Sequence, residues 1–320
     1  MHDWGKAWQL IVHAIQAFVQ YPILLVPLLL AWVVDAAVTL YLKYGWFPIH
    51  PDAGIGTDCL AVFLAILAIS LATLIACTLV LEMLQHLEDR CPSLGDAVTE
   101  TFGPDFFRVV ALSLVWALIW FALTVIETLL TRRGQSHDDD MSAEDAAKTL
   151  AGWGTFSLSR AFFSALEKGV RMIVFLILPA IAWEDLGVVA ATKKGFAVLR
   201  AHLGMFARGY ALTYASAGII FLPPAILFSL GTGRHGHAPL IVFPAEVWVG
   251  VIIYIGAAWS FCMYLEQLFM AQLYLWHMKW DAAQRAAQVA GQPVPAFETI
   301  APPVLLRNLP NFIAQGTEDA

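Results

Sequence analysis

Six long apolar stretches restrict this chain to a lipid environment. They are predicted at residues 22–43, 59–84, 109–130, 166–183, 209–230 and 246–276. A helix rises about 1.5 Å per residue, so about 20 apolar residues cross the hydrocarbon core of a bilayer. The sequence therefore predicts an all-α integral membrane protein, with six transmembrane helices in a domain that covers residues 1–276.

An amphipathic segment precedes each pair of spans. The three segments begin near Trp4, Pro92 and Leu186, roughly 90 residues apart. The apolar face of the first is formed by Trp4, Trp8, Ile11, Ile15 and Phe18. Such a helix lies in the membrane interface or packs on the surface of its own protein, and the pattern fits both. The layout predicts three parallel repeats of one amphipathic interfacial helix and two spans.

The composition excludes several functions. The chain is 59% apolar and only 13% charged, whereas about a quarter of the residues in a soluble domain are charged. Its net charge of −7 argues against nucleic acid, which requires clustered Lys and Arg. No catalytic, nucleotide-binding or metal-binding motif stands out, so we predict no catalytic residues, no metal and no cofactor.

The distribution of Lys and Arg predicts the orientation of the chain. With six spans, the side of the N-terminus holds Lys6, Arg90, Lys193, Lys194, Arg200, Arg208, Lys279, Arg285 and Arg307. Positive charge accumulates on the cytoplasmic side, so we expect both termini there. The opposite side holds a long acidic loop at residues 131–155, and residues 277–320 read as a cytoplasmic tail rich in proline.

Asp35 is the most distinctive residue, because it interrupts the apolar first span. A carboxylate at that depth costs about 2.5–3.5 kcal/mol, so it requires a partner within the bundle. Arg171 in the fourth span is predicted at the same depth, since Asp35 lies 13 residues after Pro22 and Arg171 lies 13 residues before Glu184, near the cytoplasmic end of its span. We predict an Asp35–Arg171 pair. The pair would either fix helix register or serve transport or proton relay. A protonated Asp35 that is hydrogen-bonded to the backbone is the structural alternative to the pair.

Three carboxylates are predicted near the cytoplasmic ends of the even-numbered spans. They are Glu82, Glu184 and Glu266. Two arrangements suit them. They could ring a vestibule, or they could pair with basic residues and hold the amphipathic helices against the bundle. The basic residues expected in this cluster are Lys193, Lys194 and Arg200.

The fifth span contains Pro223 and Pro224 side by side. Two prolines remove two backbone donors from the helix. The sequence therefore predicts that this span bends or breaks at the prolines.

One stretch of the sequence resembles a known family. Leu178-Pro179-Ala180-Ile181-Ala182-Trp183-Glu184-Asp185-Leu186-Gly187 is followed by Lys193-Lys194-Gly195-Phe196 and by Leu199-Arg200. This pattern resembles a bacterial six-span superfamily of unknown function that includes the membrane domain fused to some glycerophosphodiester phosphodiesterases. The resemblance implies a bacterial inner-membrane protein. It transfers no catalytic residue, because the phosphodiesterase domain is absent here.

Two functions remain open. The first is a non-enzymatic inner-membrane protein that assembles with or organises other membrane components, with membrane lipids and another membrane protein as partners. The amphipathic surfaces and the Pro-rich tail favour it. The second is a transporter or lipid-handling protein that uses Asp35 and Arg171, which the broken fifth span and the parallel repeats favour.

Overall fold

The computed structural model describes residues 2–50, 54–85, 93–134, 158–231 and 243–303, and in these ranges it contains helices and no strand. The helices are α1 (His2–Gln20), α2 (Val26–Leu40), α3 (Phe47–Ile49), α4 (Ile55–Gln85), α5 (Leu94–Thr101), α6 (Pro104–Gly134), α8 (Leu158–Ala182), α9 (Val188–Ala201), α10 (Leu203–Gly231) and α11 (Ala245–Val289). A 3₁₀ turn at Pro22–Leu25, a π-helical turn at Tyr41–Trp46 and a 3₁₀ turn at Phe297–Thr299 complete them.

Five helical stretches are long and apolar enough to cross a membrane. They are Pro22–Ile49, Gly56–Gln85, Asp105–Leu129, Leu203–Leu230 and Glu246–Val289. The chain is thus an all-helical, multi-pass membrane protein. The span expected at 166–183 lies in α8, which carries Glu167, Lys168 and Arg171 and is not among the five. The sixth span therefore stays a prediction.

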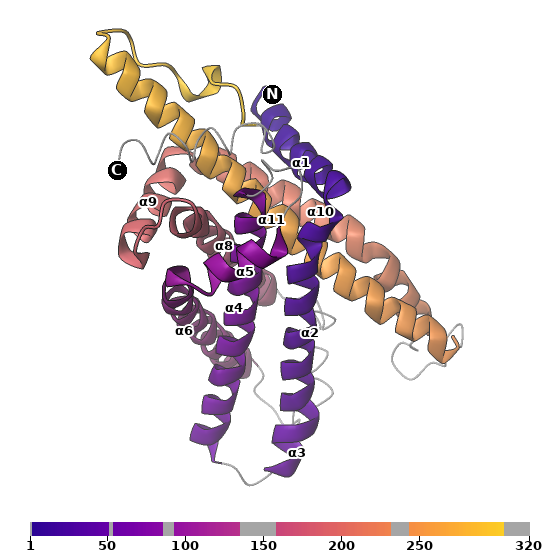
Figure 1. Ribbon diagram of the computed structural model, residues 1–320. Helices are drawn as coiled ribbons and strands as arrows, with labels where there is room; N and C mark the ends of the chain where they lie inside the picture. Colours follow the sequence, from indigo (N-terminus) through magenta and orange to yellow (C-terminus); the bar gives the residue numbers. More distant parts are fainter. Residues whose placement is uncertain (1, 51–53, 86–92, 135–157, 232–242, 304–320) are drawn as a thin grey trace.

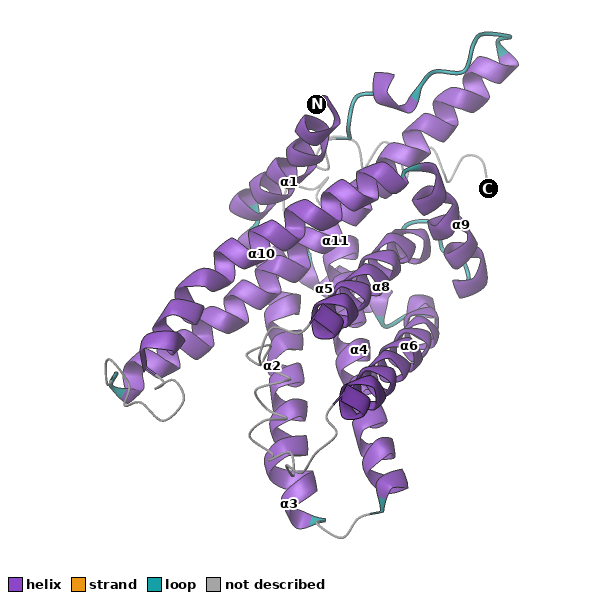
Figure 2. Cartoon of the chain, turned by 180° about the vertical axis from the view of Figure 1, so that it is seen from behind, coloured by secondary structure: helices purple, strands orange, loops and turns teal. Residues whose placement is uncertain are grey.

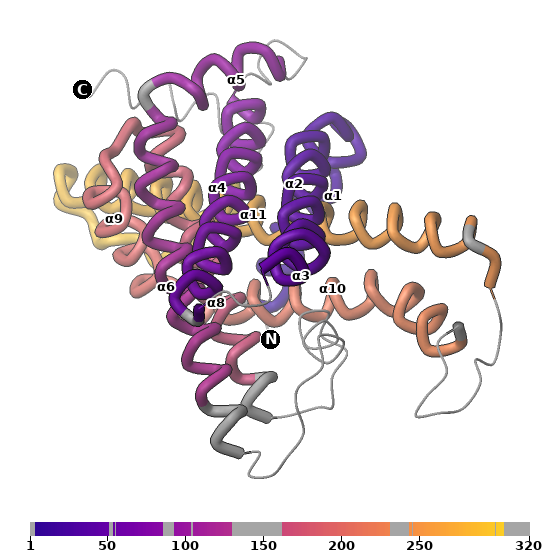
Figure 3. The backbone as a smooth tube through the Cα atoms, turned by 90° about the horizontal axis from the view of Figure 1, so that it is seen from below, coloured from indigo at the N-terminus to yellow at the C-terminus, as the bar shows by residue number. Residues whose placement is uncertain are grey.

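Three helix pairs diverge from one common region (Figure 1). α2 runs beside α4, α6 beside α8 and α10 beside α11, and the three pairs point in different directions when seen from below (Figure 3). Buried side chains concentrate where the pairs meet, in residues 74–84 of α4, 172–182 of α8 and 263–278 of α11. We call these three segments the junction. Away from it the helices expose large apolar side chains, as expected in lipid.

Side-chain hydrogen bonds to backbone carbonyls hold the junction together. The indole of Trp183 donates to the carbonyl of Leu81 at 3.3 Å, which joins the end of α8 to α4. The Gln267 amide of α11 donates to the carbonyl of Cys77 on α4. Such bonds stabilise helix contacts in lipid, where apolar burial supplies no driving force.

The first amphipathic helix packs on the protein itself. Leu10, Ile11 and Ala14 of α1 are buried against the rest of the bundle, whereas Trp4 and Trp8 are exposed. The tyrosine hydroxyl of Tyr264 donates to the carbonyl of Ala14 at 3.1 Å. The apolar face is therefore divided, since its aliphatic side chains contact α10 and α11 and its two indoles remain available to the membrane interface.

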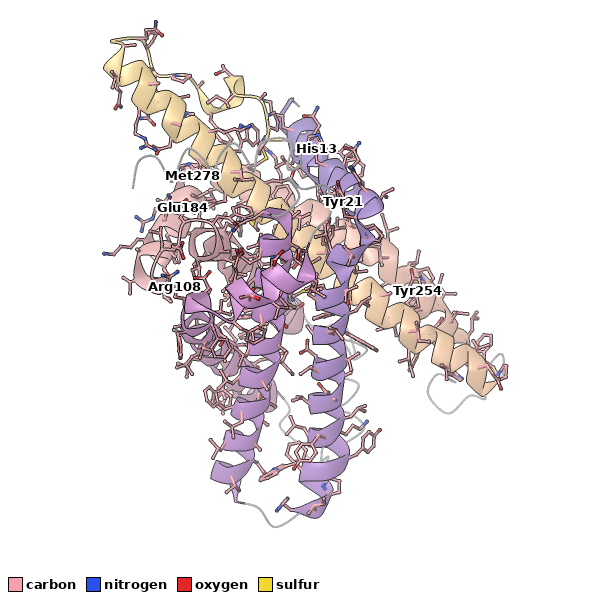
Figure 4. All side chains as sticks on the ribbon, in the orientation of Figure 1. His13, Tyr21, Arg108, Glu184, Tyr254 and Met278 are labelled. Atoms are coloured by element: carbon pink, nitrogen blue, oxygen red, sulfur yellow. The ribbon has the colours of Figure 1, made fainter. Side chains whose placement is uncertain are left out.

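The fifth span does not break at Pro223 and Pro224, because α10 continues through both residues to Gly231, and a bend there stays a prediction. Pro224 has no N–H for the carbonyl of Ile220, four residues earlier. The Tyr254 hydroxyl of α11 donates to that carbonyl at 2.7 Å (Figure 4 labels Tyr254). A neighbouring helix thus satisfies the acceptor that the proline leaves open.

Other boundaries differ from those expected. The second amphipathic segment ends at Thr101, and Ser93 caps it by accepting a hydrogen bond from the Asp96 amide. α11 continues to Val289, well beyond residue 276, and the chain then turns back along it. Residues 135–155 of the acidic loop and residues 304–320 of the tail lie outside the described residues.

Candidate functional site

A cluster of three charged side chains lies where α8 meets α11. Arg171 donates from Nε to Glu266 Oε2 at 2.9 Å and from Nη2 to Oε1 at 3.2 Å. Lys168 Nζ lies 2.9 Å from Oε1 of the same carboxylate. The Glu266 side chain is only 3% exposed. Two cations therefore share one buried anion, and breaking such a group leaves an uncompensated charge. We call Lys168, Arg171 and Glu266 the ion cluster.

The helix α10 closes the ion cluster from a third side. The rings of Tyr210 and Tyr214 lie 5.2 and 5.3 Å from Lys168 Nζ, within range of a cation–π interaction. The Tyr210 hydroxyl also donates to the carbonyl of Ala165 on α8 at 3.1 Å. The ion cluster thus ties α8, α10 and α11 together.

The predicted Asp35–Arg171 pair is not formed, because Arg171 faces Glu266 of α11. Asp35 and Arg171 both act electrostatically on Cys77 of α4. Counting residues along the two spans therefore located both side chains correctly in one region of the bundle. α4 nevertheless packs against both α2 and α8. A shared depth does not specify which helix stands between two side chains, and that is the physical reason for the error.

Asp35 instead faces the Thr73 hydroxyl of α4, without full hydrogen-bond geometry. Both of its carboxylate oxygens are buried and neither accepts a hydrogen bond. Ser70, one turn from Thr73, also has a buried oxygen without a partner. A charge at Asp35 has no compensating group in the described part of the chain, which distinguishes it from Glu266.

Of the basic residues expected near Glu184, the structure brings only Lys194 to it. Lys194 Nζ forms an ion pair with Glu184, and the Tyr274 hydroxyl donates to the same carboxylate. These contacts join the start of α9 to α11. Lys193 and Arg200 are exposed on α9 and form no ion pair with any residue that the structure describes.

Glu82 lies in a different environment from Glu184 and Glu266. Its carboxyl group faces Glu100 of α5 and lies near Asp105 and Asp185. Arg108 joins the last two, with Nη1 2.5 Å from Asp105 and 2.9 Å from Asp185 (Figure 4 shows Arg108 and Glu184). The three carboxylates therefore lie in three separate groups and do not ring a vestibule. Of the two arrangements considered, pairing with a basic residue of an amphipathic helix is found for Glu184, with Lys194 of α9.

A histidine pair that the sequence did not single out anchors the returning C-terminal segment. His202 Nε2 lies 2.9 Å from His277 Nδ1, so one ring donates and the other accepts. The ring of Phe297 stacks on His202 with centroids 3.8 Å apart. Burial, with the neighbouring His277 as a smaller cause, lowers the pKa of His202 from 6.5 to about 4. The pair therefore packs in its neutral form.

Sequence reasoning also missed the contact between Lys168 and Glu266. One signal was available. Lys168 and Arg171 are three residues apart and so share one face of α8. Two cations on one helical face within the membrane indicate a carboxylate opposite them.

The described residues contain no group of three or more His, Cys, Asp or Glu side chains that could hold a metal ion. Comparison with protein-family models, with curated proteins and with solved structures finds no match to this chain. The resemblance to the six-span superfamily therefore rests only on the residues quoted for it.

Proposed function

We propose that the protein is a non-enzymatic organising protein of the bacterial inner membrane, which assembles with another membrane protein through the outer part of α10 and α11. In this proposal six spans form three parallel repeats, and both termini face the cytoplasm. The observation that carries the proposal is the α10–α11 arm, residues 214–231 and 245–254. It projects away from the other helices (Figures 1 and 2).

Of the two helices of the arm, α10 is the least buried of the five candidate spans, whereas α11 is 33% buried. Only 11% of the most apolar stretch of α10 is buried, against 28–33% in the other four. Ile219 is 72% exposed and Ile253 is 65% exposed. An exposed apolar surface is also stable when only lipid covers it. The exposure of the arm therefore supports the proposal only together with the divergence of the arm from the neighbouring helices.

One contact at the base of the arm and one within it support a rigid docking element. At the base, Gly209 allows α10 and α11 to approach, since a Cβ there would lie 2.0 Å from the Phe269 ring. The Tyr254 hydroxyl bonds to α10 further out. A preformed pair of helices binds a partner without the entropy cost of ordering itself.

Site-specific photocrosslinking in native membranes tests the proposal. A photoreactive residue is incorporated at Ile219 or Ile253, and at Leu60 as the control, which is exposed on α4. We expect one discrete protein adduct from both arm positions and none from Leu60. Lipid adducts alone at all three positions would contradict the proposal.

The orientation rests on the Lys and Arg distribution and is tested separately. A reporter that is active only in the cytoplasm is fused after residue 320. Activity is the expected result, and inactivity with an active periplasmic reporter would reverse the orientation.

A transporter or lipid-handling protein is the second candidate function. The unpartnered Asp35 and the ion cluster favour it, because ionisable groups within a membrane commonly mark pathways for ions or solutes. Asp35→Asn is the discriminating variant. If it folds normally and retains every phenotype of the wild type, Asp35 has no role in transport.

A further inference from the structure

α9 presents an exposed face on which apolar and basic side chains alternate. The exposed residues on this face are Val189, Lys193, Phe196, Arg200 and Leu203, the last being the first residue of α10. The spacing of three and four residues places Val189, Lys193, Phe196 and Arg200 on one side of α9. Leu203 follows the end of α9 at Ala201 and the non-helical His202, and it is exposed at the start of α10. Val189 is 70% exposed and Leu203 is 61% exposed. Neither cation is neutralised by a carboxylate in the described part of the chain.

The opposite face of α9 is fixed to the bundle. Gly195 lies so close to α8 that a Cβ there would be 2.7 Å from Ile177 Cγ1. Lys194 turns inward to Glu184, and Ala191 and Val198 are fully buried. The exposed face therefore has a defined direction and cannot turn to bury its apolar side chains.

We propose that this face binds the headgroups of anionic phospholipids, with Lys193 and Arg200 on the phosphates and Val189, Phe196 and Leu203 in the upper acyl region. The charge is complementary to an anionic leaflet, although the whole chain has a net charge of −7. Mixed basic and apolar side chains on one face are typical of helices that lie in the interface.

The position of α9 in the chain supports a lipid occupant. It connects α8 directly to α10, a candidate span that begins at Leu203. A short helix between two membrane-embedded elements is held at the level where headgroups begin. A soluble acidic protein would not account for the three exposed apolar side chains, of which Phe196 lies between the two cations and Val189 and Leu203 flank them.

The experiment is native mass spectrometry of the purified full chain in detergent, titrated with phosphatidylglycerol or with phosphatidylcholine. Removing one basic residue near an anionic surface weakens binding about fivefold, and removing two weakens it about thirtyfold. We expect the wild type to prefer phosphatidylglycerol, and Lys193→Gln with Arg200→Gln to lose that preference without a change in phosphatidylcholine binding. High salt should have the same effect as the double variant.

Arg285→Gln is the matched control for Arg200→Gln, since it removes one exposed cation from α11, outside this face. The control should bind phosphatidylglycerol as the wild type does. Two results would overturn the proposal: a wild type that does not distinguish the two lipids, or an equal loss in Arg200→Gln and Arg285→Gln. The variants change only exposed side chains, and circular dichroism of each verifies its helical content.

Discussion

Arg171 and Glu266 join two helices through a forked pair of hydrogen bonds, of 2.9 Å from Nε and 3.2 Å from Nη2. The planar guanidinium fits the carboxylate in this geometry, and a lysine at the same position does not. Since Lys168 adds a third contact, the Glu266 carboxylate of α11 is the counter-charge that both cations of α8 share. The stability of the junction therefore depends on this carboxylate.

Glu266→Gln leaves Lys168 and Arg171 buried without their counter-charge. We expect the free energy of unfolding to fall by about 3–5 kcal/mol, as for other broken buried ion pairs. Thermal unfolding in one detergent measures it. The control is Asp281→Asn, which removes the partner of Arg285 from an exposed pair at 3.0 Å and should change stability by about 0.5 kcal/mol or less. Equal effects of the two variants would contradict a stabilising role of the ion cluster.

Asp35→Ala should raise the free energy of unfolding, whereas Glu266→Gln should lower it. Both oxygens of Asp35 are buried without hydrogen bonds of full geometry, so the side chain contributes a penalty to the fold that the facing Thr73 hydroxyl offsets only in part. We expect the variant to be more stable by about 1–3 kcal/mol in the same thermal assay. A loss of stability would reveal a partner for this carboxylate and would remove the contrast with Glu266.

Gly209→Ala tests the close approach within the α10–α11 pair. The added methyl group would overlap the Phe269 ring, and we expect a loss of about 1–3 kcal/mol. Gly218→Ala, on the same helix with nothing within 4 Å of its added Cβ, should be neutral or slightly stabilising. The denaturation midpoints of the two variants are compared, and a neutral Gly209→Ala would mean that the helices do not pack this closely.

Lowering the pH should weaken the packing of the returning C-terminal segment on His202, where Phe297 stacks on the imidazole ring. The pKa of His202 is about 4 in the folded chain and 6.5 in the unfolded chain, so the unfolded state binds the proton more strongly. Its contribution to stability is complete above about pH 6.5 and is lost progressively as the pH falls toward 4. Protease sensitivity after residue 290 at pH 7 and pH 5 measures it. His202→Asn should flatten this dependence, and an unchanged dependence would assign it to another group.

The sequence was sufficient to predict that the chain is helical and crosses a membrane several times, because long apolar runs have no other stable environment. It also placed Glu184 and Lys194 in one region, since Lys194 belongs to the amphipathic segment that directly follows Glu184. It could not specify the partner of Arg171. Depth along a helix follows from counting residues, whereas the direction that a side chain faces depends on how the helices pack.

The continuity of α10 was beyond sequence reasoning for a similar reason. The missing donor of Pro224 is a local property, and the Tyr254 hydroxyl that compensates for it comes from 30 residues further along the chain. The His202–His277 pair is likewise formed by residues far apart in sequence, and neither residue belongs to a recognisable motif.

The most direct test of the assembly proposal is mass spectrometry of the protein extracted from native membranes into lipid-preserving discs. We expect a second membrane protein to be recovered in stoichiometric amount with the chain. Replacing Ile219 and Ile253 by charged residues should release this second protein. A chain that is recovered with lipid alone would contradict the proposal and would favour the transport function, with Asp35→Asn as the variant to measure next.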